Sequence, residues 1–578
     1  MSILKMFAIA VVAAGMLPAE TKPWVARSNE NALVLLKEIA RYSPESAGAY
    51  GLDMYDREIL DLRPKLYERS TKTGKEAVAT LEGRLAQEKD PLVRQDLNII
   101  LKTKRDNLHQ SEVYHNRVLP YFSMTQTVFQ GIRSLLDDQV EASRRPAALI
   151  RLRRYAGMEP GYQPAASLAE SIIRERMAVP GLLGPARVEI EKDLGNSKFY
   201  VDGIGELFVK YKIEGYEPAY EKLKSQLAGY DEFVKQEILP LSRKDFRLPP
   251  ELYQLRLDQY GGDIPPAELA AKAHAAFTEI QGEMQTLAAQ IAKERGYPSA
   301  DYRDVIHELK KQQIVGEAIL PHYESRLRDI ESIIRKERLV TLPDRPARIR
   351  IASAAESASV PAPNMHPPRL VGNQGEKGEF VLPLNVPDKN GKMQNFDDFT
   401  FEAASWTLTA HEARPGHELQ FDAMVERGVS TARSLFAFNS TNVEGWGLYS
   451  EWVMKPFMPL DGQLISLQHR LMRSARAFLD PELHMGKVTP EEALRIIKTD
   501  VVLSDAMANQ ETERYMFRAP GQATSYFYGY IRLLALRQDV EKAMGTRFQA
   551  KAFHDFVLSQ GLLPPALMRK AVMAEFVK

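Results

Sequence analysis

The sequence predicts a mainly α-helical protein with one small β-sheet, placed directly before a helix that carries two histidines. From about residue 29 to residue 338, apolar residues recur at spacings of three and four between charged positions, as in amphipathic helices. Between Leu342 and Asn390 this periodicity is lost and eight prolines occur. We therefore expect a large multi-helical fold in which a short non-helical stretch separates two helical halves.

The first element along the chain is an apolar segment typical of a secretion signal. Lys5 precedes a 12-residue apolar run from Met6 to Leu17, and Ala19 is a suitable last residue before cleavage. The run is too short to span a bilayer comfortably. We assign residues 1–19 to a signal peptide and expect an exported protein, periplasmic or secreted, without stable membrane association after cleavage. An uncleaved anchor is the alternative.

Two halves are expected after the signal. Residues 20–341 form a helical N-terminal half. Residues 342–578 form a second half, which contains the small sheet and the histidine-bearing helices. Strand-like runs at 348–351 and 378–386 would make the sheet. The proline-rich segment 361–368 is expected to be a loop, either at the rim of a cleft or as a plain connector.

Composition excludes several classes of function. The chain has 578 residues, of which 44% are hydrophobic, enough for a large packed core. Lysine plus arginine and aspartate plus glutamate both number 76, so the net charge is zero, which argues against a nucleic-acid partner. Cysteine is absent. Thiol catalysis, cysteine-ligated metal, disulfide bonds and a lipid anchor on cysteine are therefore not expected.

The most informative motif is HEARPGH at 411–417, which sets two histidines and a glutamate within seven residues. Glu444 follows 27 residues after His417. Two neutral imidazoles and one carboxylate are a common protein ligand set for a catalytic zinc, although other divalent metals also accept it. Glu412, next to the first histidine, is placed to take a proton from a metal-bound water. The motif thus predicts a zinc hydrolase.

The spacing of the two histidines requires a break in the helix. Six residues place His411 and His417 roughly 240° apart on a regular helix, where they cannot share a metal. Pro415 removes a backbone donor, and Gly416 accepts unusual dihedral angles. We expect a helix from about residue 401 to residue 413, followed by a bulge or break that returns His417 toward His411. The alternative is an ordinary helix end with both histidines at the surface.

A second carboxylate accompanies Glu444. Glu444 and Glu451 are two helical turns apart, so both project from one face of a helix that Trp446 and its apolar neighbours would bury. Buried carboxylates are costly unless they are paired or bind metal. The arrangement suits one metal ligand and one carboxylate that orients a ligand histidine through its other ring nitrogen. The alternative is two buried ion pairs. If Glu444 is not the ligand, Glu451 is the substitute.

Two tyrosines near the carboxyl end are further candidates. Tyr526 and Tyr530 are four residues apart, so both phenols can point the same way from a helix that begins near Gln522. A phenol aimed at a metal site can stabilise the oxyanion of a tetrahedral intermediate. The alternative is that both rings pack in an aromatic core.

Together these segments resemble a bacterial family known as domain of unknown function 885, whose members look like zinc peptidases. The matching segments are HEARPGH at 411–417, EGWGLYSE at 444–451 and RYMFRAPGQATSYFYG at 514–529. LDPELHMGKVTPEEA at 479–493 and, more weakly, SPESAGAYGLDMYD at 43–56 extend the resemblance over nearly the whole mature chain. More distantly, the arrangement is similar to thimet-type oligopeptidases and angiotensin-converting enzyme, which lack the extra Pro-Gly spacing.

The resemblance implies a metallopeptidase fold and site. Three residues are implied as the ligands of one zinc ion: His411, His417 and Glu444. Glu412 is implied as the general base, and Tyr526 and Tyr530 as donors to the substrate carbonyl oxygen. In peptidases of this type an edge strand pairs with the substrate backbone, which would bring the predicted sheet to the cleft. We therefore expect hydrolysis of short peptides between two helical halves.

Two other functions remain open at this stage. A metal-dependent amidase acting on a non-peptide bond would use the same ligands. A non-catalytic exported peptide-binding protein would keep the fold, but an intact Glu412 argues against it because binding needs no general base. Glu418 is an alternative to Glu412 as the base, and His484 either reaches the cleft or is a buried structural histidine. Peptide specificity, exo- or endopeptidase action and oligomeric state are not predicted.

Overall fold

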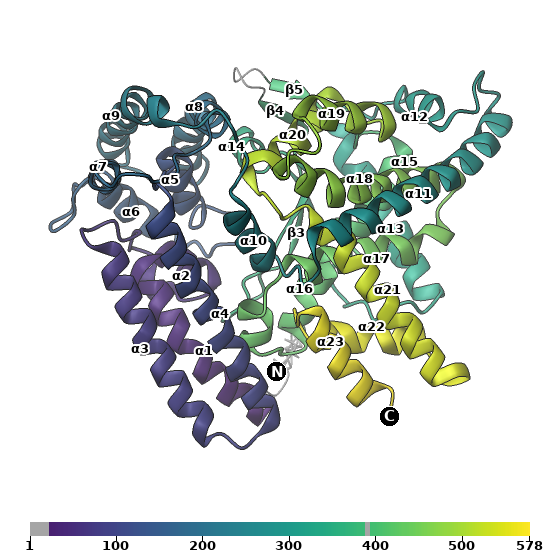
Figure 1. The fold of residues 1–578 in the computed structure, drawn as a ribbon, viewed down its shortest axis with the longest axis horizontal. Coiled ribbons are helices and arrows are strands. Elements are labelled where there is room, and N and C mark those ends of the chain that lie inside the picture. The colour runs from purple at the N-terminus through teal and green to yellow at the C-terminus, as the bar shows by residue number, and fades with distance from the viewer. Residues whose placement is uncertain (1–21, 388–392) are drawn as a thin grey trace, which may run out of the picture.

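The computed structural model describes residues 22–387 and 393–578 (Figure 1), so the predicted signal peptide lies outside the described residues. As the sequence predicts, this part of the chain is mainly α-helical, with 23 α-helices; it contains two small sheets where one was predicted. None of the described helices is both long enough and apolar enough to cross a membrane.

Nine helices from the first part of the chain form one side of the molecule (Figure 1). They are α1 (Pro23–Tyr42), α2 (Pro44–Tyr50), α3 (Leu66–Gln87), α4 (Pro91–Arg117), α5 (Met124–Arg133), α6 (Ala147–Tyr155), α7 (Ala165–Met177), α8 (Arg187–Lys210) and α9 (Glu217–Phe233). Helices α1, α3 and α4 pack on one another, whereas α5 to α9 surround a core of their own. Local signals set their ends: Asp90 accepts a hydrogen bond from the Leu92 amide at the start of α4, and Pro91 follows it.

The remaining helices form the other side of the molecule, apart from α14 (Ala354–Ser359), which packs against α8 and buries Ala355 and Ala358 in the core of the first side. They are α10 (Pro250–Gln259), α11 (Pro266–Arg295), α12 (Tyr302–Lys310), α13 (Ile319–Lys336), α15 (Glu402–Glu412), α16 (His417–Glu426), α17 (Ser440–Met454), α18 (Leu460–His484), α19 (Pro490–Arg495), α20 (Asp505–Glu513), α21 (Thr524–Met544), α22 (Ala550–Ser559) and α23 (Pro565–Ala571). This part of the described chain also contains four π-helical turns: η5 (Ala432–Phe436), η7 (Ile496–Asp500), η8 (Arg514–Arg518) and η10 (Val572–Phe576). The long helices α11 and α18 pack along each other and form the centre of this side (Figure 1).

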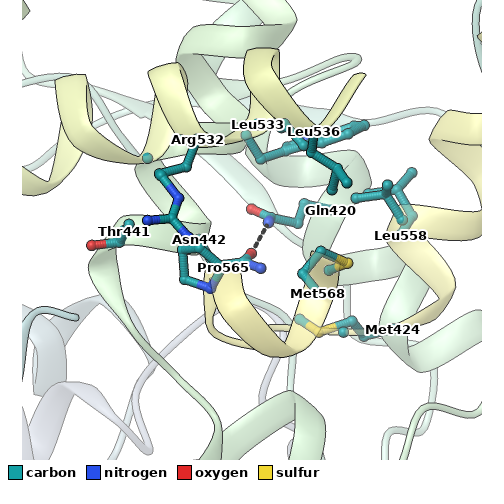
Figure 2. A pocket seen from close by; sticks show the side chains of 15 residues that line it. Gln420, Met424, Thr441, Asn442, Arg532, Leu533, Leu536, Leu558, Pro565 and Met568 are labelled. Carbon is teal, nitrogen blue, oxygen red and sulfur yellow. Dashed lines mark hydrogen bonds between the residues drawn. The ribbon is translucent and has the colours of Figure 1, made fainter. Parts of the chain in front are cut away.

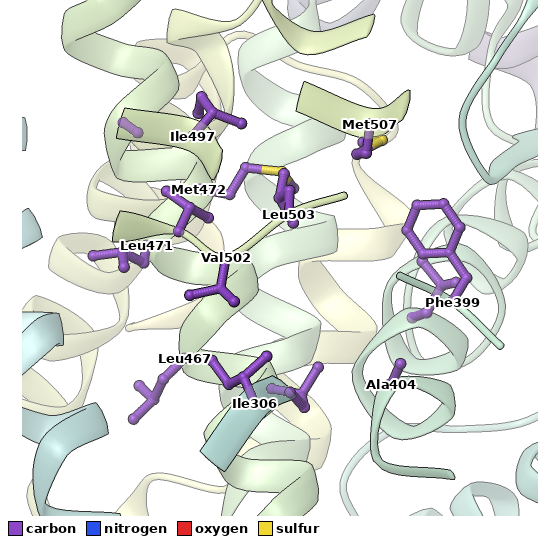
Figure 3. Close-up of a cluster of buried hydrophobic side chains, with 14 of the residues drawn as sticks. Ile306, Phe399, Ala404, Leu467, Leu471, Met472, Ile497, Val502, Leu503 and Met507 are labelled. Atoms are coloured by element: carbon purple, nitrogen blue, oxygen red, sulfur yellow. The ribbon is translucent and has the colours of Figure 1, made fainter. Parts of the chain in front are cut away.

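One hydrophobic core joins segments from before and after residue 342. Figure 3 shows part of it, where Ile306 of α12 lies near Leu467 of α18 and Phe399 precedes α15. Helices α11 to α13 bury apolar side chains in this core together with α15, α18 and α20. The boundary predicted at residue 341 therefore separates segments whose buried side chains pack together. This packing places α15, whose last turn carries His411, against α18 and α13.

The sheet lies where the helical periodicity is lost. Its strands are β1 (Arg348–Ile351), β3 (Glu379–Leu382) and β2 (Asn364–His366), in the order β1-β3-β2, and β4 (Asn385–Pro387) pairs with β5 (Met393–Asn395) in a second sheet. β1 runs parallel to β3, and β2 runs antiparallel to it. The strand-like run at 348–351 is confirmed as β1. The run at 378–386 is extended as predicted, but it is divided into β3 and β4, which belong to two different sheets rather than one. The segment 361–368, expected as a loop, contains β2, because a short edge strand tolerates flanking prolines and shows no alternating pattern.

A cavity of about 2180 Å³ lies between the two sides of the molecule. From the first side it is lined by residues that include Gln95, Ile99, Tyr121, Glu189 and Asp193. From the other side it is lined by residues that include Asn364, Glu412, His417, Glu444, Arg514 and Tyr526. The fold therefore brings the HEARPGH segment, the Glu444 helix, the RYMFRAPG segment and the edge strand β2 to one cavity.

Candidate metal centre

The three side chains predicted to bind metal converge in the structure. His411 lies in the last turn of α15, His417 is the first residue of α16, and Glu444 lies in α17. One ligand atom from each residue lies within 4.8 Å of the other two. Both histidines are buried, and 15% of the Glu444 side chain is exposed. These three residues could therefore hold a metal ion.

The turn between the histidines explains how a six-residue spacing serves one site. α15 ends at Glu412 and α16 begins at His417, so the predicted break is confirmed. The Arg414–Pro415 peptide bond is cis, and the Trp446 indole donates a hydrogen bond of 2.9 Å to the Pro415 carbonyl. A Cβ on Gly416 would lie 1.9 Å from the His411 carbonyl oxygen. Glycine is needed here because two backbone segments approach closely, rather than for a positive φ angle.

The distances fit a tetrahedral ion. The Oε2 atom of Glu444 lies 3.6 Å from His411 Nε2 and 3.4 Å from His417 Nε2. Ligands at about 2.0–2.1 Å from a tetrahedral zinc are about 3.3–3.4 Å apart. The two imidazole rings are nearly perpendicular, at 85°, with centroids 4.7 Å apart. The donor set and its spacing therefore suit a divalent ion without a large rearrangement of the three side chains.

The electrostatics of the site favour a cation. Burial lowers the pKa of His411, but hydrogen bonds to Glu444 and Glu451 outweigh it and raise that pKa to about 9. Burial raises the pKa of Glu444, but its bonds to the two histidines hold it well below its usual value. A positive charge between these groups is therefore stabilised, and a bound divalent ion would supply it in place of a proton.

Glu451 takes the orienting position that the sequence predicts. Its Oε1 accepts a hydrogen bond of 2.7 Å from His411 Nδ1, and its Oε2 accepts one of 2.8 Å from the Thr407 hydroxyl. In its neutral form, which is the form that binds metal, His411 therefore carries its proton on Nδ1 and presents the Nε2 lone pair to the site. Arg473 lies 3.7 Å from the same carboxylate. Burial raises the pKa of Glu451, but Arg473 and His411 outweigh it and lower that pKa to about 2.

We expect Glu451→Gln to weaken zinc binding by about 10–100-fold, because an outer carboxylate fixes the tautomer and basicity of its histidine. Competition titration of zinc against a chromophoric chelator measures this change. Glu541→Gln is the matched control, since Glu541 pairs with Arg537 on the surface of α21. Unchanged affinity in Glu451→Gln would show that the His411 tautomer does not depend on this carboxylate.

Gly447 leaves room for the first histidine. A Cβ at this position of α17 would lie 2.5–2.9 Å from three atoms of the His411 ring. We expect Gly447→Ala to displace the imidazole, weaken zinc binding by about tenfold or more and cost about 1–3 kcal/mol of stability through overpacking. Zinc titration and chemical unfolding measure the two effects. Ser450→Ala, which removes a buried hydroxyl without a partner in the described chain, should change neither. Full zinc affinity in Gly447→Ala would contradict the prediction.

Glu412 differs from the other buried carboxylates. It ends α15, is 7% exposed and lines the cavity beside His417 and Glu444. Within the described residues it forms no ion pair and no side-chain hydrogen bond. Burial raises the pKa of Glu412, and the two histidines partly offset this increase. A carboxylate without a structural partner at the edge of a metal site is available for proton transfer.

The two tyrosines do not occupy equivalent positions. Tyr526 lines the cavity, and its ring is nearly parallel to that of His411, with centroids 6.5 Å apart. Its hydroxyl accepts a hydrogen bond of 2.7 Å from Arg514. Tyr530, one turn later, packs in a hydrophobic core with the Arg470 guanidinium 5.3 Å from its ring centroid, and it is not among the residues that line the cavity. The structure thus brings only Tyr526 to the wall shared with the metal site.

Glu418 and His484, whose roles the sequence left undecided, both form hydrogen bonds within the protein. Glu418 is buried and accepts hydrogen bonds from Arg414 and Arg345, which hold its pKa below its usual value against the effect of burial. It is therefore tied to an ion-pair cluster and is poorly placed to act as the base. His484 accepts a hydrogen bond from the Leu248 amide and donates one to the Tyr515 carbonyl. These contacts support the interpretation of His484 as a buried structural histidine.

Sequence reasoning missed two polar neighbours of the site. Arg514 lines the cavity, and Gln522 donates a bond of 2.9 Å to Ser440 and one of 3.5 Å to Glu444 Oε1. Both lie in the segment RYMFRAPGQATSYFYG, so the resemblance could have directed attention to them. Helical spacing gave no signal for Arg514 and Gln522, because the turn at 519–523 separates η8, which contains Arg514, from α21.

A second, smaller pocket lies on another face of α17 (Figure 2). Met424, Leu533 and Met568 supply apolar walls, and Gln420 donates a hydrogen bond of 3.0 Å to Asn442 across it. None of the three metal-binding candidates lines this pocket. The candidate metal centre therefore borders the large cavity and not this pocket.

Comparison with known proteins places the chain in a family. Residues 44–572 match the family described as "Bacterial protein of unknown function (DUF885)". The chain therefore belongs to the DUF885 family, which confirms the resemblance of its sequence to that family. No curated protein matches the chain.

Solved structures show the same fold. A "putative lipoprotein of unknown function" from Shewanella oneidensis superposes with a TM-score of 0.70 at 18% identity, covering 96% of this chain and 100% of that one. A "putative lipoprotein" from Colwellia psychrerythraea gives a TM-score of 0.70 at 19% identity, covering 96% of this chain and 98% of that one. At such identities the likeness concerns the fold alone.

Proposed function

We propose that this protein is an exported zinc-dependent metallopeptidase that hydrolyses short peptides. The observation that carries the proposal is the position of Glu412. Its buried carboxylate borders the same cavity as His417 and Glu444 and has no ion-pair partner in the described chain. A metal site that only stabilises the fold does not need such a group, whereas a hydrolytic site requires a base beside the ion.

Zinc suits the donor set, because two imidazoles and one carboxylate without a thiolate are a common ligand set of catalytic zinc. When bound, the ion would supply Lewis acidity that makes a coordinated water acidic near neutral pH. Glu412 would accept the proton of the attacking water at its carboxylate and later deliver it to the departing amine. Tyr526 would donate a hydrogen bond to the carbonyl oxygen of the scissile bond as negative charge develops on that atom.

The cavity supports a peptide substrate. Its volume of about 2180 Å³ accommodates a chain of several residues, and helices from both sides enclose it. Because β2 is an edge strand whose residues Asn364 and Met365 line the cavity, an extended peptide can add to the sheet there. Enclosure on two sides favours short peptides over folded proteins.

Export is supported by two observations of different kinds. The sequence begins with the features of a signal peptide. The proteins of similar fold from Shewanella oneidensis and Colwellia psychrerythraea are both described as a "putative lipoprotein", a term for exported proteins. We therefore propose that the protein acts outside the cytoplasm.

Mass-spectrometric profiling of a diverse peptide mixture tests the proposal. The zinc-loaded protein should generate new peptide termini, and the Glu412→Gln protein should not. The positions of the new termini distinguish trimming at the ends from internal cleavage. Zinc binding without any cleavage would overturn the peptidase proposal and direct the search to non-peptide amides or to peptide binding.

A further inference from the structure

The hydroxyl of Tyr526 has a fixed donor on one side. Arg514 Nη2 lies 2.7 Å from Tyr526 Oη and can only donate. The phenol oxygen must therefore accept this bond, and its own hydrogen must point away from the guanidinium. Tyr526 lines the cavity together with Glu412 and Glu444, and its ring lies nearly parallel to that of His411, with centroids 6.5 Å apart. The hydroxyl hydrogen is therefore free to point into the cavity beside the metal centre.

The ring itself cannot turn away. The guanidinium carbon of Arg476 lies 4.4 Å from the Tyr526 ring centroid, and that of Arg514 lies 5.2 Å away. The side chain is 6% exposed. Arg476 is held in turn by two bonds of 2.6 Å to Glu511, which also accepts one of 2.7 Å from Tyr515. Packing thus fixes the ring, and Arg514 is the group that sets the direction of the hydroxyl hydrogen.

The same guanidinium orients a second donor. Arg514 Nη2 also donates to Gln522 Oε1, at 2.5 Å. Because the amide oxygen faces Arg514, the amide nitrogen faces Ser440 and the Oε1 atom of Glu444. Oε1 is not the oxygen nearest the histidines, since the short distances to both rings involve Oε2. One arginine therefore directs two hydrogen-bond donors toward the metal centre.

We propose that Arg514 is a positioning residue that aims the Tyr526 hydroxyl at the carbonyl oxygen of the substrate, an inference that rests on the proposed function. Arg514 contributes through Tyr526 and does not itself need to touch the substrate. Its charge remains near the phenol, because its nearest carboxylate, Glu511, is 3.8 Å away and is already bound to Arg476. A cation next to the phenol strengthens its donation as negative charge grows on the acceptor.

The chain offers a matched control on the same helix. Arg532 Nη1 donates a hydrogen bond of 2.8 Å to the hydroxyl of Tyr528, which also contacts Asp263. Like Arg514 and Tyr526, this pair joins a guanidinium to a phenol. Tyr528 lies two residues after Tyr526 in α21, so its side chain projects from a different face of that helix. Arg532→Met therefore removes an arginine–phenol contact without touching the residues of the metal centre.

A double-mutant cycle on peptide hydrolysis tests the proposal. We expect Tyr526→Phe to lower kcat by about 10²–10³-fold, with little change in KM and full zinc content. Arg514→Met should lower kcat at least tenfold, and Arg514→Lys should restore part of the loss because it keeps the charge. In the Tyr526→Phe background, Arg514→Met should cause no further loss. Arg532→Met should behave like the unsubstituted protein.

Additive losses in the cycle would overturn the proposal, because they would mean that Arg514 acts independently of Tyr526. A measurement that does not depend on catalysis distinguishes failure of the positioning proposal from failure of the proposed function. With 3-fluorotyrosine in place of Tyr526, the ¹⁹F signal should shift on Arg514→Met and not on Arg532→Met. If the protein cleaves no peptide, the proposed function fails, and the ¹⁹F spectra still decide the positioning role. An unchanged signal in Arg514→Met would reject it.

Discussion

Glu412→Gln is expected to lower kcat for peptide hydrolysis by about 10²–10⁴-fold, the usual contribution of a general base. The amide keeps the size of the side chain but cannot accept a proton. Because Glu412 has no ion pair or side-chain hydrogen bond in the described chain, the change leaves no partner group unsatisfied. The zinc ligands are unaltered, so the zinc content should stay at one ion per chain.

Steady-state kinetics and elemental analysis on the same preparation measure the two quantities. Glu426→Gln is the matched control, since Glu426 lies in α16, pairs with Arg345 and is partly exposed. It should retain both zinc and activity. Equal activity in Glu412→Gln and the unsubstituted protein would remove Glu412 from the mechanism. Loss of zinc together with activity would instead indicate that Glu412 supports the metal site.

Glu444→Ala is expected to abolish stable zinc binding and, with it, all hydrolysis. Glu444 is the only candidate ligand that contributes a carboxylate close to both imidazole Nε2 atoms in the described chain. Two histidines alone leave an incomplete ligand set for a catalytic zinc. The substitution also removes the negative charge that faces the two histidines, so the remaining site repels a cation more strongly.

Thermal unfolding with and without zinc tests this prediction independently of activity. A ligand that binds only the folded protein raises its Tm, so zinc should raise the Tm of the unsubstituted protein and not that of Glu444→Ala. Glu283→Ala, at a half-exposed carboxylate paired with Lys455, should keep the response. A full response in Glu444→Ala would move the third ligand elsewhere, and Glu451 would be the first residue to examine.

Much of the fold is predictable from local patterns. The helix expected over 401–413 is observed as α15 (Glu402–Glu412), and the run 348–351 is observed as β1. The helix expected near Gln522 begins at Thr524. These elements depend on hydrophobic periodicity, prolines and glycines within a few residues, which a single sequence displays directly.

Other features of the fold have no local signature. β2 is three residues long and flanked by prolines, and it becomes a strand because β3 offers it a partner. Helix α11 gives no local sign that it packs along α18, although this contact builds the core behind the metal helix. Long-range pairing of this kind depends on tertiary packing, which outweighs local preference.

By itself the sequence determined the helical class, the family and the set of candidate ligands, because these follow from residue types at short spacings. It also indicated that the Pro-Gly turn had to return His417 toward His411. Only the tertiary structure decided that Glu444 reaches both imidazoles, that Tyr526 rather than Tyr530 borders the cavity, and that Arg514 faces the phenol. The physical reason is that these contacts join helices far apart in the chain, where side-chain direction depends on how the helices cross and pack.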